Sequence, residues 1–161
     1  MTRWFVCAAA ALLAGCASYD GRNLAVGRST DADVAAEMGK PAAEIARANG
    51  ERVWYYPRGP LGRHTYAVVL GPDGRVRAVE QRLTPAYAAR IAKGISTAAE
   101  VRELLGPPSW RLRDARRRAD IWEYATLAGR EGRILRVEFS EDGVVREVIE
   151  MRDPTYNTPP G

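Results

Sequence analysis

Apolar residues are spaced for a short helix at two places in this chain, and each place is followed by segments with the alternation of strands. Val34 and Met38 stand four residues apart, as do Val101 and Leu105, so each pair shares one face of a helix. Each helix has about nine residues, too few to persist alone, and therefore needs a surface on which to pack.

The alternating segments supply that surface. In the first half, residues 53–56 are rich in β-forming types, residues 66–70 alternate, and a Gly-Pro-Asp-Gly turn at 71–74 precedes residues 76–79. In the second half, residues 122–124 and 135–139 alternate more regularly, and a turn at 140–143 leads into 144–151. Such alternation predicts antiparallel strands with one covered face and one wet face.

The two helical stretches are copies of one phrase. Residues 27–41 align without gaps on residues 94–108, and their identities far exceed the roughly one that chance would give. The turn glycines Gly74 and Gly143 lie 69 residues apart, close to the 67 that separate the helices, so the duplication covers the whole unit. The positions that carry the phrase are Gly27, Val34, Gly39 and Pro41 in the first copy and Gly94, Val101, Gly106, Pro108, Trp122 and Tyr124 in the second.

Each part of the phrase has a structural role. Thr97 and Glu100 form a capping-box pattern that starts a helix, and Thr30 and Asp33 repeat it with a shorter acid. The closing glycine suits a left-handed residue after the last turn, and the proline beyond it prevents the helix from continuing. A second, leading helix is expected from Thr84-Pro85 in the second copy, whereas Gly21 weakens it in the first copy, where the matching segment 24–27 is expected to be a turn or a single helical loop.

These patterns predict an α+β protein of two tandem repeats, each a short helix pair packed on one face of an antiparallel three- or four-stranded sheet. We expect repeat 1 at residues 24–83, repeat 2 at 84–152 and a flexible, proline-rich tail at 153–161. The length of 161 residues, with 46% apolar and 27% charged residues, suits a globular protein of this kind.

The first 15 residues are typical of an export signal rather than of a fold. Arg3 precedes an apolar run of ten residues, which is too short for a permanent membrane span. The following Leu13-Ala14-Gly15-Cys16 resembles the lipobox of bacterial lipoproteins. This resemblance implies cleavage before Cys16, a diacylglycerol on its thiol and an acyl chain such as palmitate on its amine. The alternative is an ordinary cleaved signal that contains a cysteine.

Residue 17 and the short segment after it bear on which membrane the protein is expected to occupy and how far from it the fold can reach. Ala17 is not the aspartate that, by the same resemblance, would retain a lipoprotein at the inner membrane, so the outer membrane, on its periplasmic face, is expected. Residues 16–23 are expected to be a lipidated tether that reaches roughly 25 Å when extended.

Reactive chemistry is sparse. Cys7 leaves with the signal and Cys16 is consumed by lipid, so no thiol remains for a disulfide, a nucleophile or a metal. The single histidine, His64, has no second imidazole to complete a zinc site. Acids are scattered singly, and Glu123 and Glu138 fall on the polar sides of strands, the usual solvated position. No nucleophile–base or phosphate-cradling motif is present. We therefore expect neither an enzyme nor a bound cofactor or metal.

Two features are candidates for binding. One is a basic run before residue 121, which is either a solvated hairpin tip or a contact for anionic lipid headgroups or an acidic protein; nucleic acid is not expected for an exported chain. The other is an aromatic set in which either Tyr55 or the Trp54/Tyr56 pair must face outward or into the groove between the repeats. The arginines of the basic run are Arg111, Arg113, Arg116, Arg117 and Arg118.

The phrase, the Trp122-x-Tyr124 pair and the Gly143 turn together resemble the SmpA/OmlA (BamE-like) family. That resemblance implies a membrane-anchored outer-membrane lipoprotein built from an α-α-β-β-β unit, with a role beside the machine that inserts β-barrel proteins. A tandem pair of units also resembles the architecture of the β-lactamase inhibitor protein. We therefore expect a protein-binding accessory or scaffold in outer-membrane protein assembly or envelope integrity, with an envelope protein or complex as partner. The alternative is an inhibitor-like binder of a periplasmic enzyme.

Overall fold

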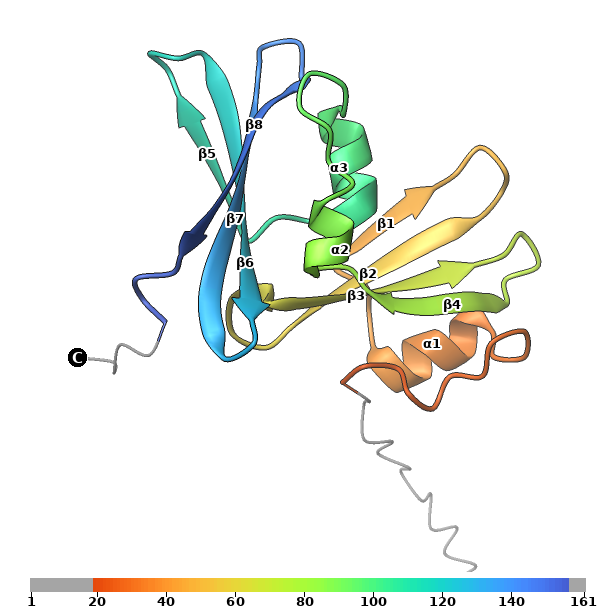
Figure 1. Ribbon diagram of the computed structural model, residues 1–161. Helices are drawn as coiled ribbons and strands as arrows, with labels where there is room; N and C mark the ends of the chain where they lie inside the picture. Colours follow the sequence, from red (N-terminus) through yellow and green to blue (C-terminus); the bar gives the residue numbers. More distant parts are fainter. Residues whose placement is uncertain (1–18, 157–161) are drawn as a thin grey trace, which may run out of the picture.

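The chain forms two units, each with its own four-stranded antiparallel sheet (Figure 1). The computed structural model describes residues 19–156. Sheet 1 consists of β1–β4 and sheet 2 of β5–β8, each in sequence order. The elements are α1 (Asp31–Met38), β1 (Ala43–Ala46), β2 (Arg52–Arg58), the 3₁₀ turn η1 (Pro60–Gly62), β3 (His64–Leu70), β4 (Val76–Gln81), α2 (Pro85–Ala88), α3 (Ala98–Leu105), β5 (Trp110–Asp114), β6 (Ala119–Ala128), β7 (Glu131–Phe139) and β8 (Val145–Arg152).

The predicted α+β class with two tandem units is confirmed, and unit 2 carries the predicted helix pair. Pro85 opens α2 behind the N-cap Thr84, and both α2 and α3 pack on sheet 2. Unit 1 departs from the prediction of a helix pair in each repeat: it has only α1, and hydrogen-bonded turns between Gly21 and Ser29 take the place of a leading helix. No helix within residues 19–156 is long and apolar enough to cross a bilayer.

The helices start as the phrase requires. In both α1 and α3 the N-cap threonine accepts a hydrogen bond from the backbone at N3, and the acid at N3 accepts one from the threonine N–H. The apolar pairs then point into the cores. Val34 and Met38 pack on sheet 1, and Val101 and Leu105 pack on sheet 2.

The C-terminal ends of α1 and α3 have the same backbone conformation and the same hydrogen bond. Gly39 and Gly106 both have φ above +80°, a conformation that favours glycine. A buried tyrosine hydroxyl then donates to the carbonyl of each glycine at 3.2 Å, from Tyr56 to Gly39 and from Tyr124 to Gly106. Each sheet also has a bulge at the equivalent place, between Val69 and Leu70 and between Glu138 and Phe139. The two copies therefore share backbone features as well as sequence.

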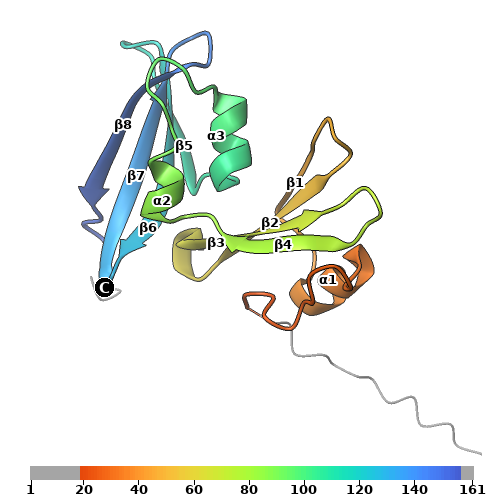
Figure 2. The same ribbon diagram turned by 45° about the vertical axis from the view of Figure 1, so that its right-hand side comes forward.

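Unit 2 packs on the face of sheet 1 that α1 leaves uncovered. Figure 2 shows α3 between the two sheets. The Tyr55 hydroxyl donates to the carbonyl oxygen of Glu103 in α3, and Arg47 Nε donates to the Glu103 carboxylate at 2.7 Å. A Cβ on Gly106 would lie 2.7 Å from the Tyr55 ring. Sheet 1 is therefore covered on both faces, and α3 contributes to both units.

The described parts of the predicted tail (153–161) and lipidated tether (16–23) pack on the body of the protein. Asp153 is buried and paired with Arg63, which also donates to Thr126 O at 3.3 Å and lies 4.7 Å over the ring of Tyr156. At the other end, the chain from Tyr19 onward is already packed on sheet 1. At both ends the partners are residues distant in sequence, such as Arg63 for Asp153 and Tyr66 for Tyr19. The rest of the tail, 157–161, and Cys16 lie outside the described residues.

Candidate functional site

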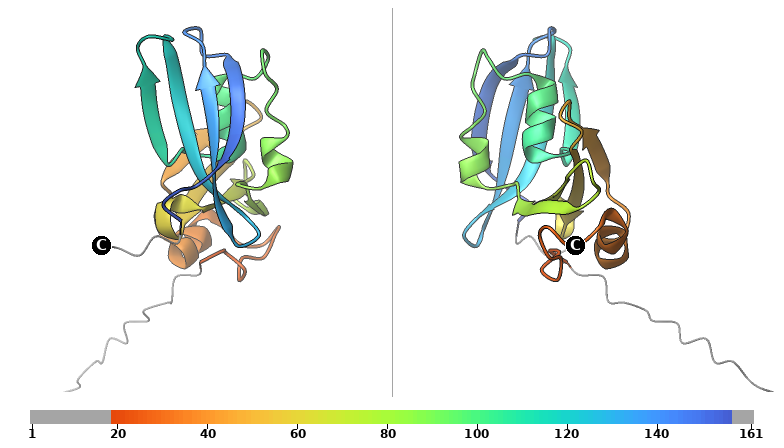
Figure 3. Two further views of the ribbon diagram at one scale, coloured as in Figure 1. Left: turned by 60° about the vertical axis from the view of Figure 1, so that its left-hand side comes forward. Right: turned by 90° about the vertical axis from the view of Figure 1, so that its right-hand side faces the viewer.

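Sheet 2 has one face that no described helix covers, and we call it the open face of sheet 2. Strand alternation and register place its side chains opposite the core residues Tyr124, Leu135 and Val137. Figure 3 (left) shows this face toward the viewer, with α3 behind the strands. The open face consists of Trp110, Leu112, Ile121, Glu123, Ile134, Arg136, Glu138, Glu147, Ile149 and Met151.

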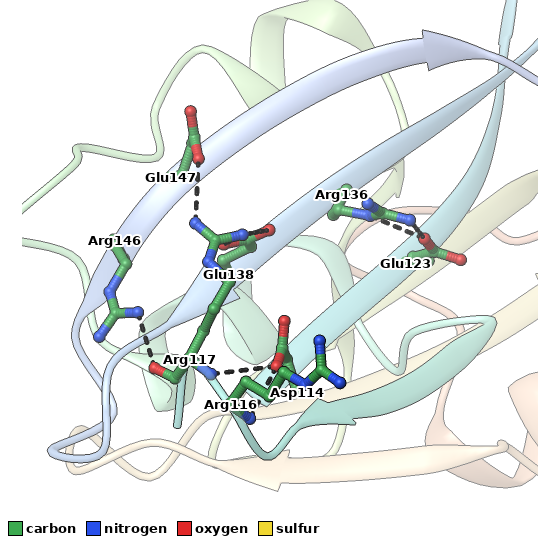
Figure 4. A network of polar contacts seen from close by, with 8 residues as sticks. All are labelled: Asp114, Arg116, Arg117, Glu123, Arg136, Glu138, Arg146 and Glu147. Carbon is green, nitrogen blue, oxygen red and sulfur yellow. Dashed lines mark hydrogen bonds and ion pairs between the residues drawn. The ribbon is translucent and has the colours of Figure 1, made fainter. Parts of the chain in front are cut away.

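Ion pairs cross the strands of the open face (Figure 4). Arg136 donates two hydrogen bonds to one Glu123 oxygen, at 2.6 and 2.8 Å. Arg117 lies 3.0 Å from the carboxylate of Glu138 and 4.0 Å from that of Glu147. Glu138 is only 2% exposed, so Arg117 neutralises a carboxylate that sits largely out of water. The charges on this face are therefore held in fixed positions.

The duplication explains why these positions are charged. In unit 1 the equivalent face is buried against α3, and an unpaired charge there would carry a large desolvation cost. In unit 2 no described helix covers this face, and the arginines that neutralise its acids stay partly exposed, at 50% for Arg117 and 32% for Arg136. The register of the strands identifies four pairs of equivalent positions in sheets 1 and 2: Tyr55 and Glu123, Ala67 and Arg136, Val69 and Glu138, and Ala78 and Glu147.

Sequence reasoning missed this arrangement. Glu123 and Glu138 were expected to be ordinary solvated residues on the polar sides of strands, but both are largely buried and paired. Alignment of the two repeats position by position would have revealed them, because an apolar residue in the first repeat aligns with an acid in the second.

The predicted basic run forms the end of β5 and the hairpin to β6, and most of its arginines have partners. Arg113 pairs with Asp120 at 2.7 Å, Arg118 lies 3.8 Å from Glu141, and Arg111 lies 4.7 Å over the Trp122 ring. Arg117 is held on the open face as described above. Among residues 19–156, the Arg116 side chain alone in this run lacks an ion pair or ring contact.

The turn between β5 and β6 is itself well braced. The Asp114 carboxylate accepts hydrogen bonds from the backbone N–H groups of Arg116 and Arg117, both at 3.0 Å, and Arg146 donates to the Arg117 carbonyl at 3.1 Å. In Figures 1 and 3 this hairpin lies at the end of the molecule away from the start of the described chain. The basic run is therefore largely neutralised by neighbouring acids, and it lies far along the molecule from the N-terminal segment.

Tyr55, the other predicted binding residue, lies in the joint between the units. Its side chain is 0% exposed, and its hydroxyl is engaged by α3. Burial raises the pKa of Tyr55 to about 12, so the hydroxyl keeps its proton and donates at neutral pH. A partner cannot reach Tyr55 in this arrangement, and we assign it to the packing of the two units.

A groove of about 370 Å³ runs between the units, lined by Arg47, Arg82 and Arg90 together with residues of α3. Arg82 is buried, pairs with Glu80 at 2.6 Å and rests over the ring of Tyr87. Arg47 is bound by two carboxylates, at 2.7 and 3.0 Å. Two of the arginines that line this groove, Arg47 and Arg82, are therefore already neutralised by carboxylates.

His64 stacks on Tyr66 with ring centroids 6.5 Å apart and meets the edge of Tyr19. Within residues 19–156 no group of three or more His, Cys, Asp and Glu side chains is placed to hold a metal ion.

Comparison with known proteins adds little to this picture. No protein-family model matches the chain, and no curated protein sequence matches it. Among solved structures, the chain is similar to a DUF4309 family protein (YjgB) from Bacillus subtilis, with 19% identity over 82% of this chain and 84% of that chain and a TM-score of 0.33. A likeness this distant carries no argument about function. The resemblance to the SmpA/OmlA family therefore stays a prediction.

Proposed function

We propose that this protein is a non-enzymatic outer-membrane lipoprotein, anchored through Cys16 on the periplasmic face, that binds an envelope protein through the open face of sheet 2. The anchoring rests on the Leu13-Ala14-Gly15-Cys16 pattern that follows the apolar run. The binding surface rests on the difference between the two sheets, because sheet 1 is covered on both faces and sheet 2 on only one.

The composition of the open face supports a reversible protein contact. Leu112 on the edge strand is 48% exposed, and Trp110 and Ile149 are half-buried around the fixed charges. Non-obligate interfaces combine apolar and polar area in this way, and prearranged charges favour one partner and orientation over others. Permanent interfaces are more apolar, as the buried face of sheet 1 illustrates.

The position of the β5–β6 hairpin favours a protein over lipid headgroups as the partner at this end. The hairpin points away from the start of the described chain, and hence from the predicted anchor. Arg116, which has no ion pair or ring contact with any residue from 19 to 156, is suited to a carboxylate on the partner.

Site-specific photo-crosslinking in the native envelope tests this proposal. A photoreactive residue in place of Leu112 should give a discrete crosslinked product, whereas one in place of Ala36, exposed on α1, should not. Charge reversal by Arg116→Glu should lower recovery of the same product, and Arg90→Glu, on the other side of the molecule, should leave it unchanged. Equal products at positions 112 and 36, or a partner-free protein after detergent extraction, would count against it. A periplasmic enzyme as the product would favour the inhibitor-like alternative.

A further inference from the structure

The first described residue is fixed to the body of the protein. The Tyr19 carbonyl accepts a hydrogen bond from Arg58 Nε at 3.1 Å, and its ring meets those of His64 and Tyr66 edge-on, with centroids 6.3 and 6.1 Å away. The Tyr19 hydroxyl packs against Gly59, so closely that a Cβ on residue 59 would lie 2.9 Å from the hydroxyl oxygen.

This attachment shortens the tether. Only Ala17 and Ser18 separate Cys16 from Tyr19, and three residue steps of extended chain span about 10 Å. The sequence-based expectation of roughly 25 Å assumed that residues up to 23 were unattached. If Cys16 carries lipid, as the proposed function holds, the surface around Tyr19 must lie beside the bilayer.

That surface is hollow and mostly apolar. A cavity of about 400 Å³ opens beside Tyr19, between the units. Tyrosine rings of this kind suit the boundary between headgroups and acyl chains, where one end of the side chain is wet and the other apolar. The residues that line the cavity are Tyr19, Gly59, Pro60, Leu61, Arg63, His64, Leu127, Thr155 and Tyr156.

Leu61 at the rim of this cavity is an unusual residue. It is 44% exposed and has φ of +60°, a left-handed conformation that costs a non-glycine residue about 1–2 kcal/mol. Its carbonyl accepts a hydrogen bond from the Ser109 hydroxyl of unit 2 at 2.8 Å, and that hydroxyl also accepts from Ala125 N. Unit 2 thus holds an apolar side chain outward beside Tyr19.

A cation lies at the same end of the molecule. Arg130 is in the two-residue turn between β6 and β7, is exposed, and has no hydrogen bond or ion pair with any residue from 19 to 156. In Figure 3 this turn and the start of the described chain are at the same end, opposite the β5–β6 hairpin. An arginine beside apolar and aromatic groups is favourable at an anionic membrane surface.

We propose that the surface formed by Tyr19, Leu61, Leu127, Arg130 and Tyr156 rests on the membrane that holds the Cys16 lipid, with bilayer lipid filling the cavity beside Tyr19. This orientation rests on the proposed lipid anchor. It directs the β5–β6 hairpin and the open face of sheet 2 into the periplasm, where a protein partner can reach them.

The test uses the lipidated mature protein in vesicles of phosphatidylethanolamine and phosphatidylglycerol, with a nitroxide on one introduced cysteine. Leu61→Cys and Leu112→Cys are matched, because the two leucines are similarly exposed, at 44% and 48%, at opposite ends of the molecule. Arg130→Cys in an exposed turn gives a second membrane-side position. Collisions of the nitroxide with oxygen, which concentrates in the bilayer, are compared with collisions with a water-soluble nickel chelate.

We expect oxygen collisions to dominate at positions 61 and 130 and nickel collisions to dominate at position 112. Lipid on Cys16, verified by mass, together with predominantly aqueous behaviour at all three positions would overturn the orientation and leave the anchor intact. An unmodified Cys16 would overturn the anchor and the orientation together. Loss of the crosslinked partner with the collision pattern unchanged would affect only the proposed binding function.

Discussion

Replacement of Gly106 by alanine should destabilise the protein more than the same change at Gly39, because only Gly106 lies in the joint between the units. The two glycines occupy equivalent positions and have nearly the same φ, 85° and 81°. A Cβ at position 39 would meet nothing within 4 Å, whereas one at 106 would lie 2.7 Å from the Tyr55 ring and 3.0 Å from the Thr65 methyl. The Gly39 variant is therefore a control for the backbone effect.

The magnitude follows from two contributions. Alanine costs about 1–3 kcal/mol at either position, because φ above +80° with ψ near −160° is a region that essentially only glycine adopts. The added methyl at Gly106 also forces the buried Tyr55 ring to shift, and overpacking of this kind costs about 1–3 kcal/mol. Gly106→Ala should therefore lower the free energy of unfolding by about 1–3 kcal/mol more than Gly39→Ala does.

Urea unfolding of the mature chain, followed by tryptophan fluorescence, measures both values. Trp54 is in unit 1, and Trp110 and Trp122 are in unit 2, so each unit contributes to the signal. Equal losses for the two variants would refute the reasoning, because they would show that α3 does not press on Tyr55 in solution.

Three further measurements follow from the same contacts. Burial alone would raise the pKa of Asp153, but hydrogen bonds from Arg63 and Thr155 outweigh it and lower the pKa to about 2. The ionised Asp153 therefore stabilises the folded protein by about 2 kcal/mol above about pH 4, and this contribution is lost as the pH falls toward 2. In urea unfolding at a series of pH values, Asp153→Asn should lack this part of the pH dependence. Tyr124→Phe, which removes the bond to the Gly106 carbonyl, should cost about 1 kcal/mol in the same assay. Thr97→Ala should cost about 1 kcal/mol through loss of the α3 cap, and an unchanged midpoint would contradict the capping geometry.

Much of the fold is local and was therefore visible in the sequence. The capping residues, the four-residue spacing of Val101 and Leu105 and the turn glycines act within a few positions of themselves. Because the phrase occurs twice, each copy supports the interpretation of the other. The helix starts, the glycine ends and the two sheets follow from these short-range rules.

The candidate site could not be predicted in the same way. The sequence places Arg117 in a basic run, but its partners, Glu138 and Glu147, lie 21 and 30 residues further on. It places Tyr19 in a tether, but the aromatic partners of Tyr19 come from β3. Such pairings depend on how strands and units meet, which single-sequence periodicity does not report.

The mass of the N-terminal peptide of the protein isolated from the envelope tests the central claim most directly. We predict a first residue of Cys16 with a diacylglyceryl group on the thiol and an acyl chain on the amine. An unmodified Cys16, or a chain that begins at another residue, would contradict the anchor on which the proposed function and the membrane orientation both depend.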